Sequence, residues 1–492
     1  MQSPEIILSI VIGYFIVLII ISKYTSEKAS NTTFFNADKS AKWYLVAYGM
    51  VGASLSGITF ISVPGWVESS ELTYFQVVIG YFIGYFIVAY VLLPVYYKNN
   101  VTSIYEYLNI RFGPNTQKTG AFFFFVSRVL GASFRLFLVA LVLHQYIFNL
   151  WNIPFEITVI FSVILIWVYT YKGGIKTIIW TDTLQTTLMV LSVVFSIYFI
   201  LDELNLSLIS FFDSDSFKEM NKVWVLESFT ERNHIIKSII GGAFITICMT
   251  GLDQDMMQKN LACKDLKSAQ KNMIFFSFVL VFVTLLFLVL GTLLYSYAYK
   301  MGIDVPFFEG KKSTDLIFPE IALNHNLGSI VSITFMLGLV AAAYSSADSA
   351  LTSLTTSFCI DFLNLDNYKI EKQKKIRIRT HIAMSALLIL VVIIYKHVLD
   401  RNVIDSLLTV ASYTYGPLLG LFALGIFTNY KINDNKVFLI SLISVLIISL
   451  PNLLYYFGII STVNFMGYEF GYELLPLNGL ITFLGLILIG RK

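Results

Sequence analysis

Gly338 to Phe358 reads GLVAAAYSSADSALTSLTTSF, an apolar run of membrane-spanning length that is rich in hydroxyl groups. Side chains on an α-helix are about 100° apart, so residues three and four positions apart share a face. One face of this stretch is small and oxygen-bearing and comprises Gly338, Ala342, Ser345, Asp348, Ser349, Thr352 and Thr356. Such residues also serve plain close packing between membrane helices. A carboxylate in hydrocarbon costs at least about 2.5 kcal/mol, so Asp348 must face protein, water or an ion. The acid favours a path for an ion or a solute over packing alone.

The composition is typical of a polytopic helical membrane protein rather than of a soluble domain. Of the 492 residues, 57% are hydrophobic and only 13% are charged, and the mean hydropathy is +0.74. The three cysteines, Cys248, Cys263 and Cys359, have no spacing typical of a metal site or a disulfide framework. The chain carries no phosphate-binding loop motif, so we expect no ATP hydrolysis.

Thirteen apolar runs of spanning length follow one another, and the polar segments between them are too short for a second domain. We therefore expect an all-α polytopic membrane protein in which residues 1–492 form a single transmembrane domain. The predicted spans lie at 5–22, 44–66, 75–97, 120–149, 155–171, 178–201, 236–257, 272–298, 329–360, 379–397, 405–428, 437–457 and 475–490.

The distribution of Lys and Arg predicts the orientation of these spans. An odd number of spans places the two termini on opposite sides of the membrane. With the N-terminus outside, the cytoplasmic segments hold 23 basic residues and the external loops hold 9. Cytoplasmic loops are enriched in basic residues, so we expect a multi-pass protein of the cell membrane with an external N-terminus and a cytoplasmic C-terminus.

Two of the predicted spans are poor continuous helices. Residues 48–66 read YGMVGASLSGITFISVPGW, with four glycines and Pro64, and the seventh span repeats the pattern with Gly241, Gly242 and Gly251. Interrupted spans five helices apart indicate an inverted-repeat transporter, in which freed carbonyls bind a cation and helix starts bind an anionic group. The alternative is that the glycines only allow close packing between helices.

Three more charged side chains fall within or beside predicted spans. Asp182, after the basic entry to the sixth span, is costly there unless it is paired or binds a cation. Arg128 and Arg135 are two helical turns apart and share one face. Either arginine can hold a substrate carboxylate through its bidentate fork, or pair with Asp182 or Asp348 as a structural partner.

Several stretches together resemble the sodium:solute symporter family, in the order in which that family carries its motifs. They are GGIKTIIWTD (173–182), GLDQDMMQKNLACKD (251–265), VAAAYSSADS (340–349) and SYTYGPLLGLFALGIF (412–427). ASLSGITFISVP (53–64) is most similar to the branch that contains the bacterial sodium/sialic acid symporters. The resemblance covers nearly the whole chain.

The resemblance implies a LeuT-like fold with a five-plus-five inverted repeat. Residues 44–201 would form the first repeat and 236–428 the second, with one extra helix at 5–22 and two at 437–490 outside the repeat. It also implies Na⁺ as the coupling ion. The main sodium site would use the main-chain carbonyls of Gly52, Leu55 and Ala342 with the hydroxyls of Ser345 and Ser346. Oxygen ligands without a full charge suit this hard monovalent ion.

A second sodium site, found in some family members, would use Asp182 with Ser345, Asp348 and Ser349. Asp348 stands where the sialic acid branch has a serine, so it can bind sodium, take a proton or pair with an arginine. The implied solute pocket would be lined by Ser54, Ser56, Gly57, Thr59, Gln76, Phe244 and Thr246, with Arg128 or Arg135 as the carboxylate contact. Gly57 replaces a hydroxyl of that branch.

We therefore predict a sodium-coupled secondary active symporter that imports a small organic solute by alternating access. Sialic acid or another sugar-like or carboxylate solute is favoured, and an amino acid or a monocarboxylate is the alternative. A proton-coupled carrier on the same fold is a further alternative, because Asp182 and Asp348 can titrate. We expect no enzymatic activity, since the spans hold no paired catalytic groups or zinc motif. The expected partners are the solute, sodium and the lipid bilayer, not nucleic acid, with the monomer as the functional unit.

Overall fold

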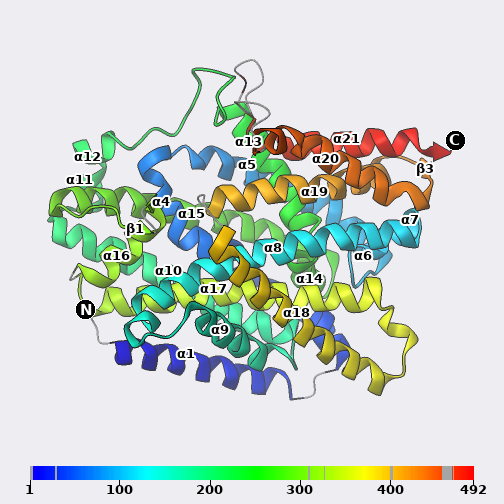
Figure 1. Cartoon of the computed structure of the whole chain (residues 1–492), viewed down its shortest axis with the longest axis horizontal. Coiled ribbons are helices and arrows are strands. Elements are labelled where there is room, and N and C mark those ends of the chain that lie inside the picture. Colours follow the sequence, from blue (N-terminus) through cyan, green and yellow to red (C-terminus); the bar gives the residue numbers. More distant parts are fainter. Residues whose placement is uncertain are drawn as a thin grey trace.

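The computed structural model describes residues 4–27, 30–308, 311–325, 327–398, 403–456, 468 and 470–491. The fold of these residues is a bundle of long helices (Figure 1). Two small sheets of two-residue strands are present, β1 (Phe307–Phe308) with β2 (Lys311–Lys312) and β3 (Lys431–Ile432) with β4 (Gly490–Arg491). The expected all-α polytopic architecture is confirmed.

Nine helices of the described chain are long and apolar enough to cross a membrane. They are α1 (Pro4–Thr25), α5 (Tyr74–Ile87) continued through η2 (Val88–Leu92) and α6 (Leu93–Asn99), α8 (Pro114–Tyr146), α10 (Ile175–Leu204), α15 (Leu266–Met301), α17 (Ser329–Ser357) continued through η6 (Phe358–Phe362), α18 (Ile370–Val398), α19 (Val403–Phe427) and α20 (Val437–Tyr456). Two bent pairs raise the number to eleven. The predicted fifth and thirteenth spans are the shorter helices α9 (Phe155–Thr170) and α21 (Leu474–Leu488). The number thirteen therefore stays a prediction, which depends on these two helices.

The first bent pair is α3 (Trp43–Leu55) and α4 (Gly57–Ser70), whose axes differ by 52°. The break lies at Ser56, whose backbone has φ 28° and ψ 168°. Residues other than glycine rarely adopt this conformation. The break does not lie at Gly49 or Gly52, which are both within α3. A Cβ at Gly49 would lie 2.9 Å from Asp182 Cβ, and one at Gly52 would lie 2.4 Å from Thr186 Oγ1. These two glycines instead let α3 pack directly on α10, as in the packing alternative.

The second bent pair joins α13 (Ile235–Thr246) and η4 (Ile247–Gly251) to α14 (Gln254–Leu261) at an angle of 62°. The bend follows Gly251 and ends at Asp253, whose side chain accepts a hydrogen bond from the Asp255 N–H at the start of α14. The prediction of two interrupted spans is thus supported at both places.

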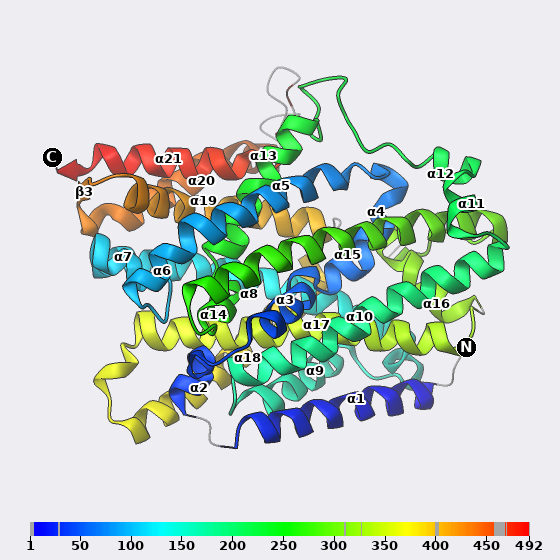
Figure 2. The same cartoon turned by 180° about the vertical axis from the view of Figure 1, so that it is seen from behind.

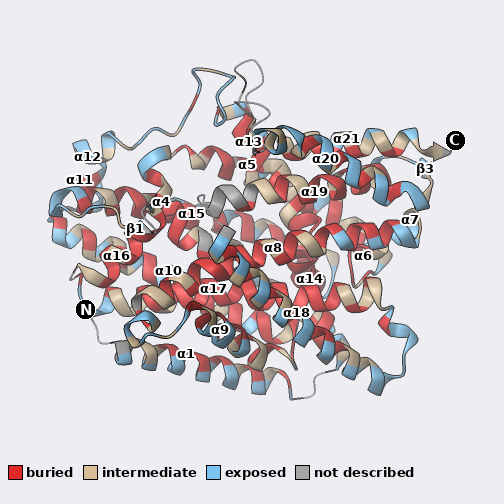
Figure 3. Ribbon diagram, in the orientation of Figure 1, coloured by how far each residue is buried: buried red, intermediate tan, exposed pale blue. Residues whose placement is uncertain are grey.

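Helix α17 lies at the centre of the molecule (Figures 1 and 2). It packs against α10, α8, α3, α4 and α1, and residues 338–357 are buried without exception. Figure 3 shows this buried centre, with exposed residues gathered on outer elements such as α1. The hydroxyl-rich face of α17, which includes Ser345, Asp348 and Ser349, therefore contacts protein rather than lipid.

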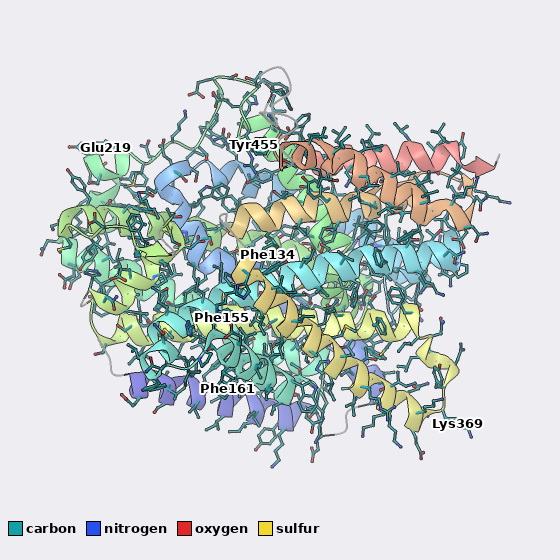
Figure 4. The ribbon with its side chains drawn as sticks, viewed as in Figure 1. Phe134, Phe155, Phe161, Glu219, Lys369 and Tyr455 are labelled. Atoms are coloured by element: carbon teal, nitrogen blue, oxygen red, sulfur yellow. The ribbon has the colours of Figure 1, made fainter. Side chains whose placement is uncertain are left out.

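The ends of the chain lie on opposite sides of the bundle. In Figures 1 and 2, α1 begins at one side and α21 ends at the other. Glu219, which follows α12 (Asp215–Lys218), and Lys369, which precedes α18, project from opposite ends of the molecule (Figure 4). The Lys369–Arg379 segment is among the cytoplasmic segments predicted from the charge distribution.

Candidate functional site

The last turn of α3 meets α17 inside the bundle. The Ser346 hydroxyl donates to the Ala53 carbonyl at 3.3 Å, and Ser345 and Ser346 are at most 1% exposed. Helix ends leave carbonyls without intrahelical partners. Among the described residues, none donates a hydrogen bond to the carbonyl of Leu55, while that of Gly52 accepts the Ser56 N–H at 3.2 Å. The structure thus joins Ser346 of the predicted main sodium site to the last turn of α3, which contains Gly52 and Leu55, and Ala342 lies one turn before Ser346 on α17.

Asp182 of α10 is paired, but with neither of the predicted arginines. Its Oδ2 lies 2.6 Å from the Nζ of Lys259 on α14, and its Oδ1 accepts the Ser345 hydroxyl at 2.7 Å. Asp182 and Lys259 are 0% and 1% exposed. In the sequence, Lys259 falls in the segment 258–271, one of the predicted cytoplasmic segments. The bend of the seventh span carries it into the core instead, where it neutralises an acid of the predicted second sodium site.

The side chains of Asp348 and Ser349 have different hydrogen-bond partners. Asp348 Oδ2 accepts the Tyr169 hydroxyl at 2.7 Å, and its buried Oδ1 receives no hydrogen bond from the described residues. Ser349 donates to Asp255 rather than to Asp182 or Asp348. Of the four residues predicted for the second site, the structure therefore joins Asp182 to Ser345 directly and leaves one Asp348 oxygen unpartnered.

Arg128 of α8 is a structural partner of two acids that the sequence analysis did not single out. Its guanidinium forms an ion pair with Asp253 at 3.1 Å and another with Asp255. The Tyr415 hydroxyl of α19 donates to Asp253. All four side chains are buried. Of the two alternatives, a structural pairing is observed for Arg128, but with Asp253 and Asp255 rather than with Asp182 or Asp348, because the bend before α14 brings these carboxylates to it.

A cavity of about 110 Å³ lies between α3, α4, α5, α8 and the bent seventh span. Six of the predicted solute residues line it, namely Ser54, Ser56, Thr59, Arg128, Arg135 and Thr246. The wall also includes residues that the sequence analysis missed, namely Tyr74, Tyr81, Tyr85, Met249 and Thr250. The three tyrosines are seven and four residues apart, a helical spacing that puts them on one face of α5 and that the sequence already displays.

Arg135 differs from Arg128 in having no acidic partner among the residues that the structure describes. Its side chain is 7% exposed and lines the cavity, and its Nε is buried without a hydrogen bond. Within the described part of the chain, no carboxylate forms an ion pair with it. A buried guanidinium without a counter-charge is costly, and an anion in the cavity would offset that cost.

The other three predicted solute residues are not part of the cavity lining. Gln76 is wholly buried and holds the segment before α13, since its amide accepts the Val225 N–H at 3.2 Å and donates to the Asn233 carbonyl at 3.2 Å. Phe244 lines a separate apolar cleft between α13, α19 and α21. Gly57 packs closely on α8, because a Cβ there would lie 2.8 Å from Val139 Cγ2.

Comparison with known proteins agrees with this geometry. The chain is 24% identical over 425 residues to the sodium/sialic acid symporter NanT of Aliivibrio fischeri, covering 85% of this chain and 81% of the relative. It is 27% identical over 395 residues to the sodium-coupled monocarboxylate transporter 1 of Mus musculus, covering 77% of this chain and 62% of that protein. A solved Na⁺-coupled sialic acid symporter in a substrate-bound, outward-open state has the same fold, with a TM-score of 0.81, 20% identity and 99% of each chain covered.

The model of the sodium:solute symporter family matches residues 34–443, which include both bent spans, the cavity and α17. The expected family and the expected coupling ion are thereby confirmed, and the proton-coupled alternative is not favoured. The chain belongs to the sodium:solute symporter family and is a sodium-coupled symporter.

Proposed function

We propose that this symporter imports a small organic anion bearing a carboxylate, with sialic acid as the leading candidate. The observation that carries the proposal is Arg135, a buried guanidinium that faces the cavity with no acidic partner among the described residues. Its planar fork matches a carboxylate with two parallel hydrogen bonds. The relatives named for sialic acid and for monocarboxylates both transport acids. The hydroxyls of Ser54, Ser56 and Thr59 supply the polar contacts that a sugar-like acid requires.

The main sodium ion binds where the break after α3 faces α17. Its ligands are the carbonyls of Gly52, Leu55 and Ala342 and the hydroxyls of Ser345 and Ser346. The open carbonyl of Leu55 and the Ser346–Ala53 hydrogen bond support this placement. Because these ligands come from both α3 and α17, the ion favours the arrangement in which the two helices touch, and it preorganises the neighbouring cavity.

A second cation site comprises Asp182, Ser345 and Asp348, with Ser349 beside them. The ionised carboxylates of Asp182 and Asp348 and the ammonium of Lys259 carry a net charge of −1. One further monovalent cation near the unpartnered Asp348 oxygen neutralises this charge. Sodium is the natural occupant, since the ligands are hard oxygens.

Transport follows alternating access in a single domain of thirteen spans that acts as a monomer in the cell membrane. Residues 44–201 and 236–428 are the two repeats, and the helices at 5–22 and 437–490 lie outside them. Sodium binds from outside, solute binds at the break, and the repeats rock to release both inside. A membrane potential of about 100 mV contributes about 2.3 kcal/mol for each charge moved inward.

The test is uptake into proteoliposomes of the purified protein. N-acetylneuraminate, lactate, proline and galactose are offered singly, with an inward sodium gradient or with potassium in its place at fixed pH. We expect sodium-dependent uptake of an acid, and none of galactose. Sodium-dependent uptake of galactose alone would contradict the carboxylate class. Uptake driven by a proton gradient without sodium would contradict sodium coupling.

A further inference from the structure

One acidic side chain connects the cavity with the hydroxyl-rich helix. Arg128, in the cavity wall, forms an ion pair with Asp255 Oδ2. The other oxygen of the same carboxylate, Oδ1, accepts the Ser349 hydroxyl of α17. A continuous chain, Ser349–Asp255–Arg128, therefore runs from α17 through the start of α14 to the solute cavity on α8.

The middle of this chain is fixed in place. The N–H of Asp255 donates to Asp253 Oδ1 at 2.8 Å, and Asp253 is itself held by Arg128 and Tyr415. Arg128, Asp253, Asp255 and Ser349 are at most 3% exposed. Charged hydrogen bonds away from water are poorly screened, so a displacement of one member is costly for the others.

The Ser349 end of this hydrogen-bonded chain lies on α17, beside the proposed sodium site. Ser349 follows Ser345 by four residues, so the two side chains stack on one helix face about 6 Å apart. The Ser345 hydroxyl, which is within the proposed sodium site, donates to Asp182, whereas the Ser349 hydroxyl donates to Asp255. A displacement of α17 would therefore move the Ser349 hydroxyl relative to Asp255.

We propose that Asp255 is a positioning residue that transmits sodium binding to the solute cavity by holding Arg128 in its wall. With sodium bound, α17 presents Ser349 to Asp255, and Asp255 keeps Arg128 turned to the cavity. When α17 moves, Asp255 loses its hydrogen bond from Ser349. The ion pair that joins α14 to α8 is then weakened, and the two helices can separate. This role for Ser349 replaces direct coordination of sodium. The proposal rests on the sodium site proposed above at Ser345 and does not depend on which solute is carried.

The test is a double-mutant cycle that uses sodium as the only probe. The apparent sodium affinity of the purified full-length protein is read from the sodium-dependent rise in its unfolding midpoint. Ser349→Ala and Arg128→Lys remove the two ends of the chain and leave Asp255 in place. We expect each single variant to bind sodium about fivefold more weakly than the native protein. The double variant should also be about fivefold weaker than native rather than about 25-fold, because both changes interrupt the same hydrogen-bonded chain.

Ser346→Ala is the matched control, because Ser346 is a proposed sodium ligand with no bond to Asp255. When Ser346→Ala is combined with Arg128→Lys, the loss of sodium affinity should equal the product of the two single losses. In Asp255→Asn protein, the effects of Ser349→Ala and Arg128→Lys should also become independent. If the losses of sodium affinity from Ser349→Ala and Arg128→Lys multiply when Asp255 is native, Ser349 is a sodium ligand or a packing residue. The proposal is then overturned.

Discussion

The Nζ of Lys259 lies 2.6 Å from the Oδ2 of Asp182 in the core. The local sequence around either residue does not predict this pair. The residues are 77 positions apart, and Lys259 reads as one of several lysines in a cytoplasmic loop. The sequence does show that a buried Asp182 needs a cation, because an unpaired carboxylate is costly in a membrane interior. It cannot show which cation, since the partner depends on how α10 packs on the bent seventh span.

Lys259→Met should lower the unfolding midpoint, because it leaves Asp182 buried without its cation. Breaking a buried pair from one side costs about 3 to 5 kcal/mol. Lys259→Met combined with Asp182→Asn should recover most of that loss, since no unpaired charge remains. Thermal unfolding of the two variants in detergent checks this. Equal midpoints for the single and the double variant would argue against a mutually compensating pair.

Arg135→Lys should weaken binding of the transported acid by at least about tenfold, because lysine keeps the charge but loses the bidentate fork. The sodium-dependent rise in unfolding midpoint should persist, since no proposed sodium ligand is touched. Arg377→Lys is the control, a buried arginine on α18 whose guanidinium lies over the Phe34 ring outside the cavity. An Arg135→Lys protein with native solute affinity would remove Arg135 from the solute site.

At the scale of elements, the sequence predicts where apolar helices lie but misplaces the cause of a break. Glycine and proline in the second span suggested a break anywhere from Gly49 to Pro64. The structure keeps Pro64 inside α4 and uses Gly49 and Gly52 for contact with α10, while Ser56 takes the unusual backbone conformation. Helix-weakening residues mark a span as unusual, but tertiary packing selects the one residue that departs from helical geometry.

The contact between α5 and α13 depends on glycine at both faces. A Cβ at Gly242 would lie 2.3 Å from the Val77 carbonyl oxygen, and one at Gly80 would lie 2.2 Å from the Ile239 carbonyl oxygen. Gly242→Ala should therefore push the helices apart and lower the unfolding midpoint. Gly13→Ala on α1 is the matched change, because nothing lies within 4 Å of its added Cβ. A Gly242→Ala protein as stable as Gly13→Ala would show that backbone contact does not hold this pair.

For the whole molecule, the predicted orientation can be tested at the two ends labelled in Figure 4. Glu219 and Lys369 are both exposed, and the native Cys248, Cys263 and Cys359 are buried. In intact cells, a membrane-impermeant maleimide should label Glu219→Cys protein and spare Lys369→Cys protein, because basic segments stay in the cytoplasm. Both variants should react after the cells are opened. Labelling of only the Lys369→Cys protein in intact cells would invert the topology.

Helix α21 is outside the predicted repeat, yet it is locked to α19, which is inside it. At Gly420 of α19, a Cβ would lie 2.7 Å from the Gly479 carbonyl oxygen of α21, and at Gly416 it would lie 2.2 Å from the Asn478 amide. The Asn478 side chain also donates to the carbonyls of Ser412 and Tyr413. Helices this close cannot slide or roll separately. A displacement of α19 during transport would therefore also move α21 and the lipids around it. We expect the transport rate to depend in part on membrane viscosity.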